Sequence, residues 1–192
     1  KTVEPAAFAA AAHAQHSGGL GVCLVSTGCA ATNTLTGVLS AWQDGLPCVF
    51  ISGQNTLAET TRYTGKALRT FGQQEADIVS IVASITKYAV MITDPANIAH
   101  ELDKALFLAM SGRPGPVWID IPLDIQSMRV VAEELPRFAP GANLPGPPAA
   151  EDVRWVAVIG TTVAWTCIPG SALLFGRIGG LGHHAQLEGA RS

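Results

Sequence analysis

Residues 21–54, GVCLVSTGCAATNTLTGVLSAWQDGLPCVFISGQ, most constrain what this chain can fold into. They hold an apolar run at 22–25, a break at Thr27 and Gly28, a helix-length segment at 31–42 and a second apolar run at 48–51. That order and length are typical of a strand, a turn, a helix and a parallel strand. Because such a unit presents backbone groups at the turn after its first strand, we expect a ligand near residues 26–33.

The rest of the chain repeats this alternation. Apolar spacing and breakers predict further helices at 5–15 and 75–84, a helix opened by Asp94 and Pro95, and strands at 88–92 and 117–121. The uniformly apolar run 22–25 predicts a strand that is buried on both faces. The sequence therefore predicts an α/β fold, a parallel sheet flanked by helices.

The later chain differs in character. Prolines become frequent after Met128, so we expect the α/β domain at 1–127, a Pro-rich linker at 128–150 and a tail at 151–192. The polar segment 55–70 reads as a long surface loop of the kind that often carries function. The tail suggests one strand, at 153–163, and is too short to build a core of its own.

Composition excludes several classes of protein. The chain is 48% hydrophobic and 14% charged, which indicates a folded core rather than disorder. A net charge of −3 without a basic run argues against a nucleic-acid partner, and no apolar run reaches the length of a membrane span. The N-terminal residues are not expected to form a signal peptide, the cysteines show no CxxC spacing, and a reducing cytoplasm is the expected location.

Taken singly, the candidate residues have plain structural readings. Glu4 would offset the positive start of a helix, and Gln74 would be a loop residue. The turn STGCAATN has no GxGxxG and no Walker lysine, and its Thr32 or Asn33 would cap a helix. His13 and His16 lack a third ligand, so no metal site is expected in this chain, and Cys23 and Cys48 read as buried thiols.

Taken together, three segments resemble a known family. They are residues 21–54, residues 68–90 (LRTFGQQEADIVSIVASITKYAV) and residues 111–126 (SGRPGPVWIDIPLDIQ). In order and spacing they resemble the N-terminal pyrimidine-binding domain of thiamine diphosphate enzymes of the acetolactate synthase type. The resemblance covers residues 4–126 and implies the thiamine diphosphate-binding fold, without its first strand and helix.

The resemblance also implies a function. Members are transferases or lyases that decarboxylate or ligate 2-oxo acids, some of them in branched-chain amino acid biosynthesis. It implies thiamine diphosphate, Mg²⁺ held by a domain outside this chain, a homodimer or tetramer, and in some relatives FAD. The particular 2-oxo acid stays open.

Site residues follow from the same resemblance. Glu4 matches the carboxylate that bonds the cofactor's aminopyrimidine and activates its thiazolium carbon, and Gln74 matches a glutamine that reaches the neighbouring subunit's cofactor. These two are the expected catalytic residues. The expected cofactor-binding residues are Thr27, Gly28, Cys29, Ala30 and Asn33, which match the family turn SGPGATN, and Gln54 of the ISGQ strand end.

Two departures favour an alternative, a non-catalytic fragment or interaction domain that keeps the fold without activity. Cys29 and Ala30 stand where the family has Pro-Gly, and Glu4 lies one residue nearer Gly18 than the family spacing. No GDG…N metal motif occurs in the sequence. Whether the chain is an enzyme is therefore open, and alone it is expected to be inactive.

Overall fold

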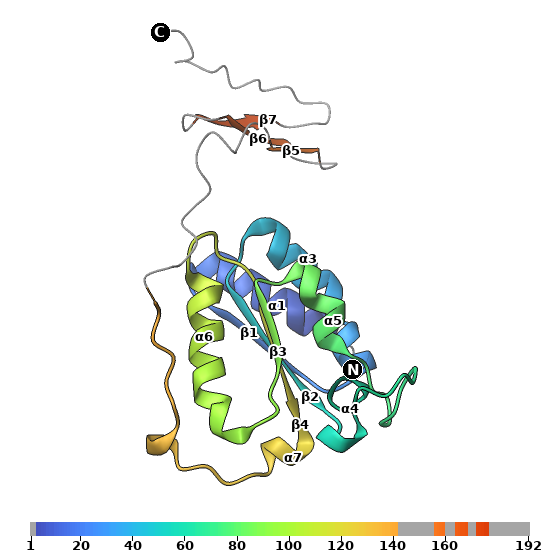
Figure 1. Cartoon of the computed structure of the whole chain (residues 1–192). Helices are drawn as coiled ribbons and strands as arrows, with labels where there is room; N and C mark the ends of the chain where they lie inside the picture. Colours follow the sequence, from blue (N-terminus) through green and yellow to red (C-terminus); the bar gives the residue numbers. More distant parts are fainter. Residues whose placement is uncertain (1–2, 142–155, 160–163, 169–171, 177–192) are drawn as a thin grey trace. The chain divides into compact units, whose positions relative to one another are not determined.

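The structure, a computed structural model, describes residues 3–141, 156–159, 164–168 and 172–176 (Figure 1). The chain divides into two compact units, residues 1–145 and residues 146–192. Each unit is described by itself.

The first unit is built on a sheet of four parallel strands in the order β1-β2-β4-β3. The strands are β1 (Gly21–Val25), β2 (Cys48–Gln54), β3 (Tyr88–Met91) and β4 (Val117–Pro122). The helices are α1 (Glu4–Ser17), α2 (Cys29–Thr32), α3 (Leu35–Asp44), α4 (Thr61–Thr64), α5 (Ile78–Val82), α6 (Ile98–Met110) and α7 (Leu123–Gln126). Short 3-10 turns are η1 (Leu57–Glu59), η2 (Ala83–Ile85), η3 (Pro95–Asn97) and η4 (Ala132–Glu134). The predicted parallel sheet flanked by helices is confirmed.

Helices cover both faces of this sheet. On one face α1, α3 and α5 pack around Phe50 and Trp118, which are fully buried and stack with ring centroids 5.5 Å apart. On the other face α6 packs Ala105 and Ala109 against strands β2, β3 and β4. Figure 1 shows α6 on the opposite side of the strands from α1, α3 and α5. These two cores fix β2 and β4 at the centre of the sheet.

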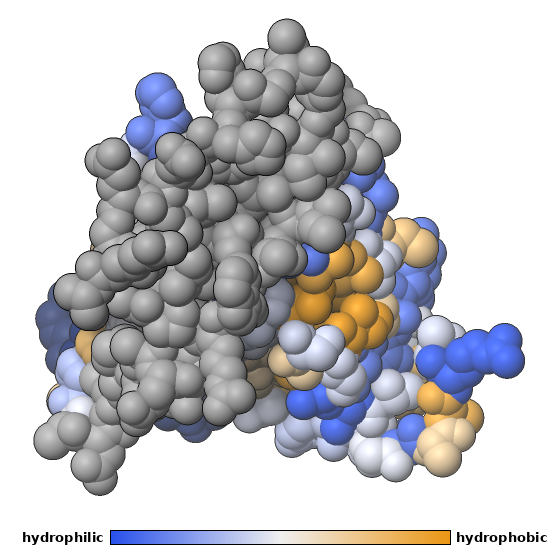
Figure 2. Space-filling view, turned by 90° about the horizontal axis from the view of Figure 1, so that it is seen from above, coloured by the Kyte–Doolittle hydropathy of each residue, from blue (hydrophilic) through white to orange (hydrophobic). Residues whose placement is uncertain are grey.

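Strand β1 is buried on one face only, so the expectation of burial on both faces was wrong. Its side chains alternate, and Val22 and Leu24 are 57% and 74% exposed while Cys23 and Val25 are buried. The reason is position, because β1 is an edge strand that α1 covers on one side while α6 lies over the other strands. Figure 2 shows a further patch of hydrophobic residues among hydrophilic ones on the surface seen from above.

Two predicted helices have different bounds. The helix expected at 31–42 is two helices, α2 and α3, and the break between them buries Thr34, whose hydroxyl donates to the carbonyl of Ala31 at 2.7 Å. The helix expected from Glu75 begins at Ile78 instead. Asp77 caps it by accepting from the amide of Ser80, and Glu75 turns inward.

The second unit contains a small antiparallel sheet. Its strands are β5 (Val156–Ile159), β6 (Ala164–Ile168) and β7 (Ala172–Gly176), in the order β5-β6-β7. The strand predicted at 153–163 overlaps β5, and its other residues lie outside the described ones. Among the described helices of the chain, none is both long and apolar enough to cross a membrane.

Candidate functional site

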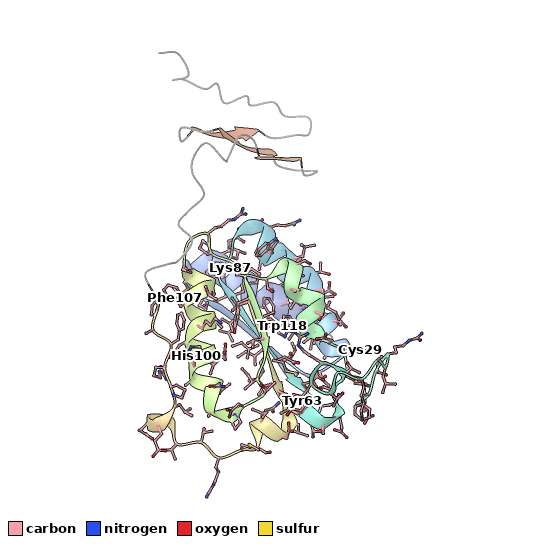
Figure 3. All side chains as sticks on the ribbon, in the orientation of Figure 1. Cys29, Tyr63, Lys87, His100, Phe107 and Trp118 are labelled. Carbon is pink, nitrogen blue, oxygen red and sulfur yellow. The ribbon has the colours of Figure 1, made fainter. Side chains whose placement is uncertain are left out.

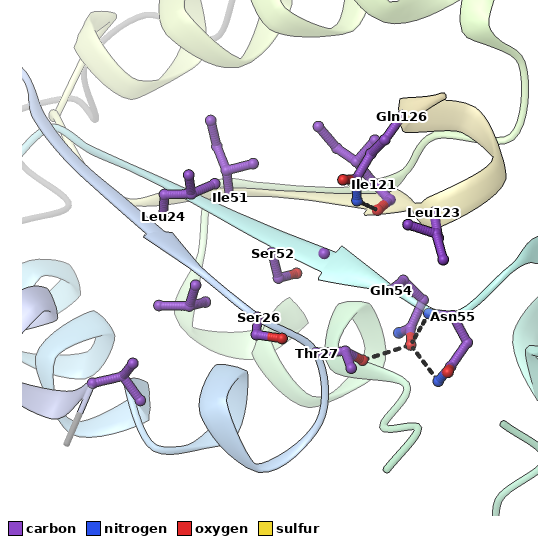
Figure 4. A pocket seen from close by; sticks show the side chains of 13 residues that line it. Leu24, Ser26, Thr27, Ile51, Ser52, Gln54, Asn55, Ile121, Leu123 and Gln126 are labelled. Carbon is purple, nitrogen blue, oxygen red and sulfur yellow. Dashed lines mark hydrogen bonds between the residues drawn. The ribbon is translucent and has the colours of Figure 1, made fainter. Parts of the chain in front are cut away.

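A cavity of about 730 Å³ opens where β1, β2 and β4 end (Figure 4). Parallel pairing places these ends together, with Val25 beside Ser52 and Ser52 beside Asp120. One wall is apolar and is formed by Leu24, Ile51, Ile121 and Leu123. The remaining lining is mostly polar, and includes Ser26, Thr27, Gln54, Asn55 and Gln126. The carboxyl ends of parallel strands are where α/β sheets bind ligands.

The start of α1 lies at the same edge. Because a short turn joins α1 to β1 and the two pack together, the helix runs back along the strand and begins where the strand ends. Val3, the residue before the helix, lines the cavity, and Glu4 is its first residue and half-buried. The carboxylate that the resemblance singled out therefore belongs to the residue next to a cavity-lining one.

The turn after β1 packs against the segment that carries Gln74. Gly28 has a φ of 59°, and a Cβ on it would lie 1.8 Å from the carbonyl oxygen of Gln74. Gln74 itself has a φ of 56°, which is uncommon for a residue other than glycine. The structure thus brings together Gly28 and Gln74, two predicted site residues that are 46 positions apart in the sequence.

Gln54 ties the turn to the sheet. Its Oε1 accepts from the Thr27 hydroxyl at 2.7 Å and from the amide of Asn55 at 3.0 Å, and its Nε2 donates to the carbonyl of Ala76 and to Asp120 Oδ2, both at 3.0 Å. It is 6% exposed, so these bonds satisfy a buried amide. Gln54 and Thr27, both predicted site residues, are direct partners.

Asp120 is a site residue that the sequence reading missed. It is 1% exposed and accepts from the Ser52 hydroxyl at 2.5 Å, and Ser52 in turn accepts from the indole of Trp118 at 2.9 Å. Burial raises the pKa of Asp120 from 3.8 to about 6, although the hydrogen bonds from Ser52 and Gln54 lower it. A lone carboxylate inside the apolar strand VWIDIP was the available signal, because buried charges need partners.

Glu75 is the second missed residue. Its buried carboxylate accepts from the amide and hydroxyl of Thr61 at 2.5 and 2.7 Å, and from the amides of Phe71 and Gly72 at 2.6 and 3.3 Å. Burial raises its pKa, but these hydrogen bonds outweigh burial and the net pKa is lowered. One carboxylate thereby closes the loop from Thr61 to Gly72 next to Gln74.

Of the predicted site residues, only Thr27 and Gln54 line the cavity, and Cys29, Ala30 and Asn33 lie farthest along the turn from these two. Cys29 is exposed at the start of α2, Asn33 is exposed after its end, and Ala30 lies between them. Figure 3 places Cys29 at the margin of the unit, on the same side as Tyr63, whereas Trp118 lies over the middle of the sheet. The expected capping by Thr32 or Asn33 is wrong, since α2 and α3 begin after Gly28 and Thr34 and neither has a side-chain cap.

The departure at Cys29 and Ala30 is structurally mild. The residue of the turn with positive φ is Gly28, which matches the family glycine, and Ala30 lies in helical conformation. A Cβ is compatible with that backbone. The close approach of backbone therefore depends on Gly28 and not on position 30.

Two of the thiols belong to the core. Cys23 and Cys48 are buried, as predicted, and burial raises the pKa of both, that of Cys48 to about 11. Among the described residues, no three His, Cys, Asp or Glu side chains gather closely enough to hold a metal ion.

The fold and the site define a class, an α/β domain that offers a half-apolar cavity and an acidic helix start at the carboxyl edge of its sheet. Residues 3–81 match the family described as thiamine pyrophosphate enzyme, N-terminal TPP binding domain. This segment contains Glu4, the turn after β1, Gln54 and Gln74. Over residues 3–81 the chain is similar to this family.

The chain is also similar to acetolactate synthases. It is 43% identical over 153 residues to acetolactate synthase 2, chloroplastic, of Zea mays, covering 78% of this chain and 23% of that one. It is 37% identical over 139 residues to acetolactate synthase, chloroplastic, of Arabidopsis thaliana, covering 72% and 19%. With acetolactate synthase of Arthrospira platensis the identity is 39% over 125 residues, covering 65% and 20%. The matched part is about a fifth of the length of these relatives.

Proposed function

We propose that this chain supplies the pyrimidine side of a thiamine diphosphate site in a 2-oxo acid decarboxylase and carboligase of the acetolactate synthase type. One observation carries the proposal. The strand ends, the turn with Gly28 and the start of α1 converge on one cavity, and most of that cavity lies within the residues matched to the thiamine pyrophosphate family. The alternative is a domain that binds without catalysis.

The cavity suits an aminopyrimidine, a flat ring with apolar faces and polar edges. Leu24 and Ile51 offer an apolar wall, and Thr27 and Asn55 offer polar groups at its rim. Glu4 would hold a proton at a ring nitrogen, where a half-buried carboxylate bonds more strongly than in water. When bound, thiamine diphosphate supplies the electron sink for decarboxylation.

The proposal extends to parts outside the cavity. Mg²⁺ and the diphosphate, and FAD where it is used, would bind outside the described residues. We further propose a homo-oligomer in which Gln74, exposed beside the turn, reaches a neighbouring subunit's cofactor. A reducing cytoplasm as the location is supported by the free thiols of the described residues.

Complementation tests the catalytic role. The chain is mixed with the separately expressed diphosphate-binding domain of an acetolactate synthase, thiamine diphosphate and Mg²⁺, and pyruvate consumption is measured. The mixture should turn over, and Glu4→Gln should lower the rate by about 10²- to 10⁴-fold, the range for a proton-transfer group. His13→Gln, an exposed change in the same helix, is the matched control and should keep the rate.

Three other results of these experiments would change the proposal. Turnover that survives Glu4→Gln contradicts the role of Glu4. Cofactor binding without turnover in the wild-type mixture supports the non-catalytic alternative. Tight, Mg²⁺-dependent binding by the chain alone would contradict the claim that the diphosphate side lies on another domain.

A further inference from the structure

A continuous buried chain of hydrogen bonds runs from the core to the cavity. Trp118 donates to Ser52 at 2.9 Å, Ser52 donates to Asp120 at 2.5 Å, and Gln54 donates to Asp120 at 3.0 Å. Gln54 then accepts from Thr27 at 2.7 Å. Ser52, Gln54 and Asp120 are at most 6% exposed, so water does not compete for these bonds. Ser52, Gln54 and Thr27 line the cavity, whereas Trp118 and Asp120 do not.

The nitrogen and the oxygen of the Gln54 side-chain amide have different hydrogen-bond partners. Its nitrogen donates to two acceptors, Asp120 Oδ2 and the carbonyl of Ala76. Its oxygen accepts from three donors, the hydroxyl of Thr27 and the backbone and side-chain amides of Asn55. Turning the amide over would set nitrogen against the amide of Asn55 and oxygen against two acceptors. The carboxylate of Asp120, which can only accept when ionised, therefore favours one orientation.

We propose that Asp120 is a positioning residue for the turn after β1, acting through Gln54 on Thr27. Asp120 does not line the cavity, and its two carboxylate oxygens are taken by Ser52 and Gln54. Its effect on the turn thus passes through the orientation of one amide. The inference rests on the proposed function only in that this turn is the one assigned to the cofactor.

Neighbouring charges do not perform this task. Arg62 and Asp77 are the charged groups that act on Asp120, and they pair with each other at 2.9 Å. Arg62 also donates to Ser80, so both groups are committed to the start of α5. Ser52 bonds the other oxygen of Asp120 and has no bond to Gln54.

Asp120→Asn isolates the role, since it keeps the shape and replaces one acceptor by a donor. If the NH2 of the new amide faces Gln54 Nε2, two donors oppose each other; if it faces Ser52, that hydroxyl has to accept, and its own proton loses the acceptor that Asp120 supplied. We expect Gln54 to lose its fixed orientation. The backbone amide proton of Asn55 donates to Gln54 Oε1, and it should then exchange with solvent at least tenfold faster. The control is the amide proton of Ile92, which donates to the backbone carbonyl of Asp120 at 2.9 Å. Its exchange rate should change only as much as the change in global stability requires.

A double-mutant cycle on the chain alone tests the relay. Thr27→Val should lower the midpoint of urea denaturation in the wild type. In the Asp120→Asn chain the same substitution should lower the midpoint by less than half as much, although Thr27 and Asp120 do not touch. Thr86→Val is the matched control, because it also removes a buried Thr hydroxyl bond, to Val82 at 2.9 Å, and should be additive with Asp120→Asn. Asp120→Glu, which displaces the carboxylate by one methylene, should also speed Asn55 exchange if Asp120→Asn does not fold.

Additivity of Thr27→Val with Asp120→Asn, or unchanged Asn55 exchange in the folded Asp120 variants, would overturn the inference. Both readouts need no cofactor. A failure here is therefore distinct from a failure of thiamine diphosphate binding, and each can occur without the other.

Discussion

Asp120 has its carboxylate in the interior of the sheet, and its ionisation costs stability. Its pKa in the folded chain is about 6, against 3.8 for an ordinary aspartate, chiefly because burial disfavours the charge. A raised folded pKa means that the folded state binds the proton more tightly. The stability that protonation gives is complete below about pH 4 and is lost as the pH rises through 6.

This sign gives a pH prediction. Between pH 7 and pH 5, the free energy of unfolding of the wild type should rise by about 1 kcal/mol relative to that of Asp120→Asn, which does not titrate. Urea denaturation at a series of pH values measures the difference. Two curves that run parallel over this range would show that Asp120 does not titrate there.

Glu75 has the opposite sign. Its lowered pKa means that its contribution is present above the ordinary value of 4.5 and is lost as the pH falls through the folded value. Glu75→Gln turns one acceptor oxygen into a donor facing backbone amides, and should cost about 1 to 3 kcal/mol in urea denaturation. Glu59→Gln, in the same loop but exposed, should change stability by less than about 0.5 kcal/mol. Equal effects of the two would refute the role given to Glu75.

At the scale of elements, the turn after β1 depends on Gly28. Gly28→Ala adds both a strained backbone and a Cβ that would lie 1.8 Å from the carbonyl of Gln74. Gly112 has the same φ of 59° with nothing within 4 Å, so Gly112→Ala measures the cost of a side chain at positive φ without a close contact, about 1 to 2 kcal/mol. Gly28→Ala should cost about 1 to 3 kcal/mol more, the usual range for overpacking. Similar losses in the two variants, measured in urea, would mean that the contact with Gln74 is loose.

Strand β1 offers a matched pair for its one-sided burial. Val25→Thr places a hydroxyl in the core and should cost about 1 to 3 kcal/mol. Val22→Thr makes the same isosteric change at a side chain that is 57% exposed and should stay within about 0.5 kcal/mol. A Val22→Thr chain destabilised as much as the Val25→Thr chain would indicate that something covers the outer face of β1.

At the scale of the whole molecule, periodicity predicted the alternating elements because local pattern determines them. It failed where long-range contacts decide. The apolar run 22–25 cannot report that α6 leaves β1 uncovered, and the helix pattern 31–42 cannot report the buried break at Thr34. The pattern predicted a helix start at Glu75 and could not reveal that its carboxylate turns inward, because its four hydrogen-bond donors come from residues up to 14 positions away.

The residues of the candidate site also differ in how far the sequence could reveal them. Of the residues that the resemblance singled out, Thr27 and Gln54 line the cavity and Gly28 lies beside them, because their positions follow from strand ends. It missed Asp120, whose importance depends on the pairing of β4 with β2 and on an amide 66 residues earlier in the chain. Position alone did not reveal that Cys29 and Asn33 point to solvent.

The central claim is that this chain binds the pyrimidine side of thiamine diphosphate at the carboxyl edge of its sheet. Titrating the ¹⁵N-labelled chain with thiamine diphosphate, while recording amide chemical shifts, tests it most directly. The account predicts that the shifts gather at Val3, Thr27, Gly28 and Asn55, and that Glu4→Gln weakens the binding that they report. Shifts at the amino ends of the strands, around Gly21 and Leu46, or no shifts at saturating cofactor, would contradict it.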